Sequence, residues 1–540
     1  MSRVDAAFAL EAELAPDVWV EITEDVIDSE AKASYGIKGN DPNQRMAGTG
    51  QLFFELNNSH SNSAGTMGYY SPGTYTCREG FAGGMRVRAR FTYEGKTYYK
   101  FLGRVPKNGI RAEAGLWDGR RTGVEVRDWM EAAASYEIRG REVQTGLRAD
   151  QALRVLIGDM PLPLQPQNTE FASGQDAFET VFDKAKAGTV LMSEAAKLVA
   201  SEPGYLYVKR DQTHGETLVF ENRFSRFLKE KTELQRSQAY ARSLCAEDGS
   251  FLLTEDGQRL VIDDTYEADF ECIGDLLPEF GGQVYNRVHG RVYPRYADIE
   301  VQVLARLQSP IFLAAGASVT VQIPYRDPNN KALNVAGFDM QPPEKNVDYS
   351  FNALKGGNGT NLSDDLGVTP VYGSSEVYVT FTNHRSSGGW VIAYQARGYG
   401  LYAYDTVSFV AEDVTVEFGA ETLELDMPYQ VDPIKAKVFS EYYLGEYGRA
   451  VGGLQWVDLV ANISDKHMVA FLEKEPGDRV GLQEAVTGIW HDFIINGCEW
   501  AHQTDVIHFR WYVMRTSDMA VNWARYDIDV YDDAAKGYAI

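Results

Sequence analysis

The sequence predicts a mainly β fold with a minor α part, organised as several β-barrel or β-sandwich domains and a small three-helix segment. The chain combines 50 Gly with 31 Tyr and 25 Phe, which is typical of short strands joined by tight turns. Runs in which apolar and polar residues alternate occur over most of its 540 residues. Helical spacing is concentrated in residues 145–203.

The first domain is expected to be an N-terminal β-barrel over residues 1–140. Its clearest element is a strand from Met85 to Tyr93, whose apolar side chains lie on one face while Arg86, Arg88 and Arg90 lie on the other. Gly95 then predicts a hairpin turn. The other expected elements are strands at Val18–Val26, 51–56 and 97–105, a strand that ends at Asp128, and an Ala-rich helix at 129–136.

Residues 141–230 are expected to form a helical segment with a closing β-hairpin. Caps and terminal Pro or Gly predict three short helices at 149–161, 175–188 and 193–204, followed by the hairpin at 204–223. An acidic connector is expected at 231–282, because EDG recurs at 247–249 and 255–257 and predicts two turns around a short strand.

Two further β domains are expected, a second barrel or sandwich at 283–425 and a C-terminal β-rich domain at 426–540. The C-terminal domain should contain a helix at 434–444 and strands at 454–462, 492–501 and 506–514. Because the strands of the first domain should find partners within its first 140 residues, we expect that domain to stay folded without the residues after about 425.

The charge excludes one class of partner. Lys and Arg total 52 against 77 Asp and Glu, which gives a formal charge of −25 and opposes a grip on nucleic acid through phosphate neutralisation. DNA is therefore expected only as a passing cargo. The four cysteines, Cys77, Cys245, Cys272 and Cys498, are far apart and predict neither a disulfide scaffold nor a zinc finger. No signal peptide and no run of 18 apolar residues is found, so stable membrane insertion is not expected.

The sequence nominates no catalytic residue and no cofactor site. HExxH, GxSxG and CxxC are missing, and Gly95-Lys96-Thr97 reproduces only the end of a phosphate-binding loop, with Arg90 where the first Gly should stand. With 77 acidic residues, close carboxylate pairs are expected everywhere and single out no glycosidase pair.

Metal ligands are densest at His491, Cys498, His502 and His508, where three of the eight histidines fall within 20 residues. Such side chains could hold zinc, but gaps of six, three and five residues fit no zinc pattern. Alternating strands would also scatter them over both faces. We therefore expect ordinary strand residues and no metal.

Two surface motifs admit both a binding and a structural interpretation. Arg86, Arg88 and Arg90 could bind an anion or an acidic partner, although the solvated or salt-bridged face of a strand is the favoured interpretation. Tyr69-Tyr70 could form a sugar-binding loop, although a packed turn is favoured.

The order of elements resembles the hub proteins of long-tailed phage baseplates and tail tips. The resemblance is carried by the Trp19–Val26 opening strand with ITEDV, the Gly48–Leu56 strand followed by Asn57-Asn58, GYYSPG at 68–73, FLGRV at 101–105, VEVRDWM at 124–130, GLRADQALRVLI at 146–157, LVASEPGYLYV and FENR, and later by YNRV at 285–288, YPR at 293–295 and TFTN at 380–383. It covers about three quarters of the chain.

The resemblance implies a structural, non-enzymatic virion protein that is assembled in the host cytoplasm. It implies a homotrimer in which two barrels per subunit form a ring, with the tail tube or distal tail protein, the tape-measure protein and a distal fibre or receptor-binding protein as partners. Two alternatives stay open: the region after residue 283 could bind a host glycan or protein, or the chain could be a virion-associated glycan hydrolase.

Overall fold

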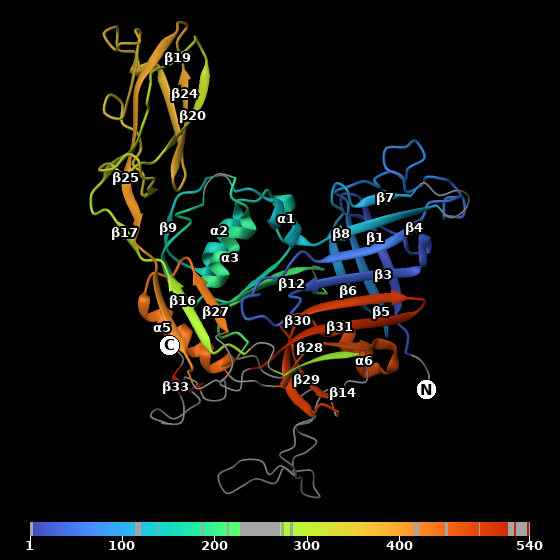
Figure 1. Cartoon of the computed structure of the whole chain (residues 1–540). Coiled ribbons are helices and arrows are strands. Elements are labelled where there is room, and N and C mark those ends of the chain that lie inside the picture. Colours follow the sequence, from blue (N-terminus) through green and yellow to red (C-terminus); the bar gives the residue numbers. More distant parts are fainter. Residues whose placement is uncertain are drawn as a thin grey trace, which may run out of the picture.

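The computed structural model is mostly β, as the sequence predicts, and has three parts (Figure 1). A broad sheet holds strands from both the N-terminal and the C-terminal parts of the chain, a helical segment lies beside it, and an elongated β unit projects away from both. The structure describes residues 4–113, 120–138, 140–185, 188–212, 215–226, 270–271, 275–280, 284–414, 421–448, 452–484, 486–516, 523–524 and 537–538. The predicted acidic connector, with its EDG repeat, Cys245 and Cys272, lies almost entirely outside these residues.

The broad sheet has 14 strands and joins the two ends of the chain. The central pairing is antiparallel, between residues 31–36 of β3 and residues 497–502 of β30. From the N-terminal side come β1 (Ala7–Ala15), β2 (Val18–Glu21), β3 (Val26–Gly36), β4 (Gln51–Asn57), β5 (Arg86–Tyr93), β6 (Lys96–Arg104), β7 (Ile110–Ala112) and β8 (Arg121–Arg127). From the later chain come β14 (Phe270–Glu271), β15 (Leu276–Phe280), β28 (Gly452–Val460), β29 (Arg479–Glu484), β30 (Ile489–Gln503) and β31 (Val506–Arg515), with helix α6 (Asp465–Glu473).

None of the sheets closes into a barrel within the described residues, which differs from the expected barrels. The path of the large sheet runs from β15 to β2, and these two strands do not pair with each other. The free side of β3 is taken by β30, so the first β unit continues into the C-terminal one instead of closing on itself.

The β5–β6 hairpin forms as its pattern predicts. Burial alternates at every residue of β5, and the turn residues Glu94 and Gly95 both have positive φ, 47° and 77°. Two consecutive positive φ values match the twist of the flanking strands in a two-residue hairpin. The opening strand is more complex than expected, because a preceding strand, β1, was not predicted, and a short helical turn, η1 (Thr23–Asp25), separates β2 from β3.

The helical segment contains three packed helices, of which two correspond to the helices predicted at 149–161 and 193–204 and one to the Ala-rich helix predicted at 129–136. They are α1 (Trp129–Ser135), α2 (Ala149–Gly158) and α3 (Leu191–Ser201). The prediction of a helix at 175–188 is wrong, because strand β11 (Ala177–Val181) pairs there with β9 (Gln144–Arg148). Phe178 and Thr180 are buried while Ala177 and Glu179 are exposed, a period of two that fits a strand. The segment is completed by β10 (Thr169–Phe171), β12 (Tyr205–Lys209), β13 (Thr217–Glu221) and the turn η3 (Leu162–Leu164).

The region expected as one second β domain has a base and a projecting unit. In the base, β16 (Arg287–Val292) lies between β26 (Val407–Glu412) and β27 (Thr422–Met427), and α5 (Pro433–Tyr447) packs on them. The projecting unit is organised around β25 (Gly389–Ala403), which pairs with five shorter strands. Its other elements are β17 (Arg295–Ala297), β18 (Gln302–Arg306), β19 (Ile311–Leu313), β20 (Ser318–Pro324), β21 (Ala336–Phe338), β22 (Tyr349–Asn352), β23 (Leu366–Tyr372), β24 (Glu376–Asn383) and the turn η4 (Ser363–Asp365).

The short elements that remain are the turn η5 (Ala461–Ile463) and the parallel pair β32 (Trp523–Ala524) and β33 (Gly537–Tyr538). Among the described residues, no helix has the length and apolar character needed to cross a membrane.

The largest hydrophobic core lies where the two ends of the chain meet. It contains Phe91 of β5, Phe471 of α6 and Trp500 of β30. The ring centroid of Phe91 lies 5.1 Å from that of Phe471 and 5.5 Å from that of Trp500. The first and last β units therefore share one core as well as one sheet.

Candidate functional site

The four candidate metal ligands do not converge. Cys498 and His502 are buried on the same strand, four residues and therefore roughly 13 Å apart. His502 donates from Nδ1 to the carbonyl of Ser29 at 2.6 Å. His508 is exposed on β31 opposite Ala501, and His491 lies opposite Leu482. Within the described ranges, no three His, Cys, Asp or Glu side chains form a group that could hold a metal.

We expect elemental analysis of the washed protein to find no stoichiometric transition metal. The physical reason is the separation of these side chains, since zinc ligands must all come within about 2.0–2.3 Å of one ion. One zinc per chain, lost on His502→Ala, would contradict this expectation.

The three arginines of β5 are paired with acids on the neighbouring strands. Arg86 bonds to Glu13 at 2.5 Å, and Arg88 and Arg90 bond to Glu11 at 2.5 and 3.1 Å. The hydrogen bond from Arg86 lowers the pKa of the Glu13 carboxyl. The salt-bridged interpretation of this row is therefore confirmed.

The aromatic turn at 69–70 is packed. Tyr70 is fully buried and its hydroxyl donates to Asp25 at 2.6 Å, which is the structural interpretation. The Gly95-Lys96-Thr97 motif is the predicted hairpin turn, and Lys96 pairs with Glu473 at 3.1 Å.

A buried charge network, not predicted from the sequence, joins the first β unit, the C-terminal β unit and the helical segment. Lys100 of β6 pairs with Glu475 after α6, and the backbone N–H of Arg210 donates to the same carboxylate at 3.1 Å. The Arg210 guanidinium lies 3.3 Å from Asp128 and 3.6 Å from Glu216. All five residues are at most 9% exposed. Two cations face three carboxyl groups, so the network is neutral when one carboxyl group is protonated.

Glu216 is the carboxyl group that carries the proton most readily. Burial, together with the nearby Asp128 carboxylate and against the opposing effect of Arg210, raises its pKa from 4.5 to about 7. Among the described residues, none donates a hydrogen bond to its Oε2 atom. Because the pKa is higher in the folded state, the folded protein binds the proton more tightly, and stability should fall as pH rises from 4.5 to about 7.

Glu216→Gln is expected to stabilise the protein at pH 8 and to have little effect at pH 4.5. A pKa change from 4.5 to about 7 corresponds to roughly 3 kcal/mol of unfolding free energy at high pH. Urea unfolding of both proteins at the two pH values measures this difference. If the unfolding free energies of the variant and the wild type fall by the same amount between pH 4.5 and pH 8, Glu216 is not the titrating group.

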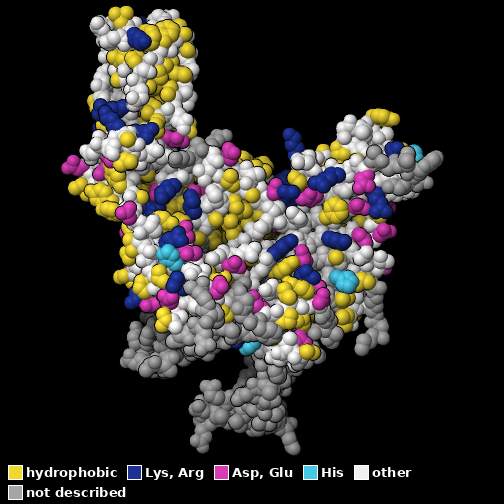
Figure 2. All heavy atoms as spheres, viewed as in Figure 1, with side chains coloured by type: hydrophobic (Ala, Val, Ile, Leu, Met, Phe, Trp, Pro, Cys, Tyr) yellow, Lys and Arg dark blue, Asp and Glu magenta, His cyan; other side chains and the backbone are white. Residues whose placement is uncertain are grey.

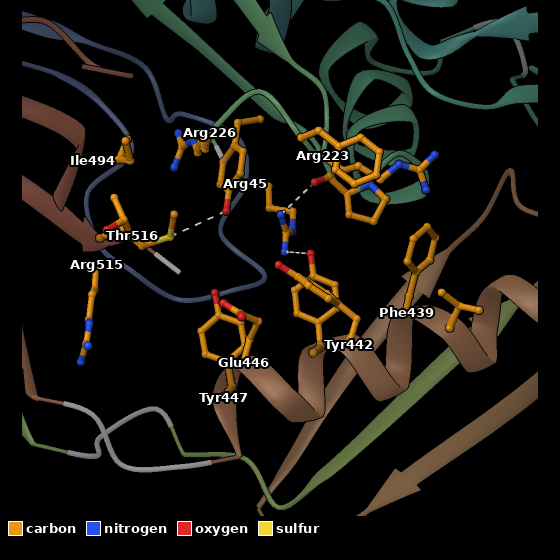
Figure 3. A pocket seen from close by; sticks show the side chains of 16 residues that line it. Arg45, Arg223, Arg226, Phe439, Tyr442, Glu446, Tyr447, Ile494, Arg515 and Thr516 are labelled. Carbon is orange, nitrogen blue, oxygen red and sulfur yellow. Dashed lines mark hydrogen bonds between the residues drawn. The ribbon is translucent and has the colours of Figure 1, made fainter. Parts of the chain in front are cut away.

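An aromatic pocket of about 100 Å³ lies between the helical segment, α5 and the ends of β30 and β31 (Figure 3). Arg45 lies in its centre (Figure 3). The guanidinium donates to the carbonyl of Pro203 at 3.0 Å and to the hydroxyl of Tyr443. It also lies 5.0 and 5.1 Å from the ring centroids of Tyr205 and Tyr443. We name this site the Arg45 pocket. Its other lining residues are Arg223, Phe224, Arg226, Val438, Phe439, Tyr442, Glu446, Tyr447, Ile494, Met514, Arg515 and Thr516.

No sequence pattern pointed to this pocket. Arg45 lies in a turn-rich stretch, and its tyrosine partner Tyr443 is 398 positions away. A single Arg in a polar loop is indistinguishable from a solvated one until its partners are known.

The projecting unit exposes apolar side chains, and hydrophobic surface is prominent along it (Figure 2). At its far end, near β19 (Figure 1), Phe312 is 54% exposed and Leu354 is 56% exposed. The Phe312 ring lies 5.2 Å from that of Trp390, and Lys355 lies 5.4 Å from the Trp390 ring. We name these four residues the tip patch.

No family model and no curated protein matches the sequence. Solved structures align over most of its length. A tail protein from Neisseria meningitidis has a TM-score of 0.43 and 10% identity, with coverage of 94% of this chain and 96% of that one. A 43 kDa prophage tail protein from Shewanella oneidensis has a TM-score of 0.41 and 9% identity, with 94% and 97% coverage. A type VI secretion component of E. coli, described as similar to T4 tail proteins gp27 and gp5, has a TM-score of 0.34 and 8% identity, with 92% and 74% coverage. These are distant likenesses, and they are to proteins of the kind that the sequence resembles.

Proposed function

We propose that the chain is a structural component of a phage tail tip, a hub-like subunit that assembles into a trimeric ring. The observation that carries the proposal is the β3–β30 pairing, which places two β units side by side in one chain. Three such chains would supply six β units around an axis, the arrangement that the sequence resemblance implies. The second unit would be the C-terminal one and not the 283–425 tract.

In this proposal the ring continues or closes the tail tube. Its partners are the tail tube or distal tail protein, the tape-measure protein and a distal fibre or receptor-binding protein, and the protein resides in the virion after assembly in the host cytoplasm. The protein then acts by assembly, without catalysis.

Mass photometry and negative-stain imaging of the purified chain test the ring. Three chains of 60.3 kDa should give a closed particle with threefold symmetry, alone or after addition of the tail neighbours. A particle that stays at monomer mass under both conditions would remove the ring.

We also propose that DNA passes the protein without being held. Since Glu11, Glu13 and Glu21 pair with the three arginines of β5, wild type should not retain duplex DNA in a gel-shift assay at low salt. The double variant Glu11→Gln/Glu13→Gln is the matched control, because it should gain weak, salt-sensitive binding. Tight salt-sensitive retention by wild type would contradict the proposal.

A host-binding function is the second candidate, and the tip patch favours it. Phe312 and Trp390 offer a pair of aromatic rings, inclined by 56°, at the end of the projecting unit, which suits a glycan or a protein contact. Incubation with host cell-wall material separates the candidates: binding lost in Phe312→Ala indicates a receptor module, product release indicates a hydrolase, and neither indicates the hub alone.

A further inference from the structure

Arg45 is a buried cation, and none of the described carboxyl groups pairs with it. The side chain is 8% exposed, and its contacts are one carbonyl, one hydroxyl and two tyrosine rings. A guanidinium has five N–H donors, so several remain available in the pocket. Buried arginines are normally paired with carboxylates, because an isolated charge is costly to remove from water.

The neighbouring arginines of the pocket have their charges compensated. Arg226 bonds to Glu221 at 2.8 Å, and Arg223 pairs with Asp176 and with Glu202. Arg515 and Glu446, which also line the pocket, carry opposite charges. Asp176 also pairs with Lys435, so five cations, Arg45 included, face four carboxyl groups, and the Arg45 pocket has an excess of one positive charge.

The tyrosines around Arg45 cannot balance that charge at neutral pH. Burial raises the pKa of Tyr443 to about 12 and raises the pKa values of Tyr442 and Tyr447. These phenols stay neutral, and they supply aromatic walls and hydroxyl groups around the cation (Figure 3).

We propose that the Arg45 pocket binds a single carboxylate that is carried on an aromatic or apolar group. One unmatched guanidinium fits one negative charge, and its planar N–H groups fit the two oxygens of a carboxylate. The aromatic walls bury the carrier. A doubly charged phosphate fits less well, because one of its charges would remain uncompensated in a site lined mainly by apolar atoms.

Two different molecules can supply a carboxylate of this kind to the pocket. One is this chain itself, because Thr516 lines the pocket and the sequence that follows contains Asp527, Asp529, Asp532 and Asp533 close to Tyr526 and Tyr531. The other is a separate molecule, such as an acidic segment of an assembly partner. A segment of the same chain would act at high effective concentration.

Binding of fluorobenzoate to the full-length protein, followed by fluorine NMR, tests the pocket. Wild type, or the full chain with the four aspartates replaced by asparagine, should bind the probe, whereas neutral fluorobenzyl alcohol should not bind. Arg45→Gln should weaken binding at least about tenfold, the loss expected for a charged hydrogen bond. Arg111→Gln removes the same charge from a side chain that is 79% exposed and should leave binding unchanged.

Val438→Glu provides a second variant that leaves the buried groups intact. Val438 is partly exposed on the pocket wall, so its tethered carboxylate should displace the probe. Tighter probe binding after the four Asp→Asn changes identifies this chain as the source, and equal binding identifies another molecule. The inference is overturned if fluorobenzoate binds neither the wild type nor the variant with the four Asp→Asn changes. It is also overturned if Val438→Glu and folded Arg45→Gln both bind fluorobenzoate as well as the wild type does.

Discussion

Replacement of Trp500 by alanine is expected to lower the free energy of unfolding by about 3–5 kcal/mol. Trp500 is 3% exposed on β30, and its ring contacts Phe91 from the first β unit and Phe471 from the last. Its indole N–H also donates to the carbonyl of Lys100 at 3.3 Å. Removal of the ring leaves a cavity where the two units meet, which denaturant unfolding followed by circular dichroism would measure.

Leu162→Ala is the control for this variant, because Leu162 is 83% exposed and its truncation should change stability by less than about 0.5 kcal/mol. If Trp500→Ala is equally mild, the shared core does not stabilise the fold.

The shared sheet also changes our expectation for a chain that ends at residue 425. The sequence led us to expect a folded first domain, but without β30 the edge of β3 is exposed, and limited proteolysis should find no stable N-terminal fragment.

Glu475→Gln is expected to destabilise the protein by about 3–5 kcal/mol, because it leaves a buried cation without its counter-ion. Lys100 is 2% exposed, and Glu475 is its carboxylate partner. The same carboxylate accepts hydrogen bonds from Tyr35 at 3.0 Å and from the backbone of Arg210 at 3.1 Å, so its loss loosens the contact between both β units and the helical segment.

The double variant Lys100→Met/Glu475→Gln should recover a large part of that loss, because it buries no unpaired charge. Urea unfolding of the wild type, the two single variants and the double variant gives the coupling energy between Lys100 and Glu475. Additive effects would show that the pair is not coupled, and the network would then be a set of independent contacts.

Local patterns in the sequence predict local structure well. The β5–β6 hairpin follows from strict alternation and from Gly95 in the turn, and α1 begins at the predicted place because Asp128 caps it by accepting from the N–H of Met130. In both cases the residues that determine the element lie within about ten positions of one another, so no tertiary information is needed.

The residues around 177–181 show where local reasoning fails. Ala177 and Glu179 favour a helix by propensity, but pairing with β9 and burial of Phe178 select a strand. Tertiary context overrides weak propensity in such short segments.

The Arg45 pocket and the buried charge network could not be predicted, for a related reason. Each depends on side chains that are hundreds of positions apart, such as Lys100 and Glu475, separated by 375. Neither residue has a sequence neighbourhood that distinguishes it from the many exposed charges of this chain. By contrast, the spacing of the candidate metal ligands was enough to argue against a metal site, because those residues are close to one another in the sequence.

The pairing of β3 with β30 has a consequence for synthesis on the ribosome. Ala31 pairs with His502, and at about 5–20 residues per second the ribosome needs roughly 25–90 s to make the intervening chain. During that time the edge of β3 is complete and has no partner, which is the situation in which nascent strands associate with the wrong chain. Slow translation should therefore lower the yield of soluble protein, and a chaperone that covers this edge should raise it. Both should change the yield more than the stability of the finished fold.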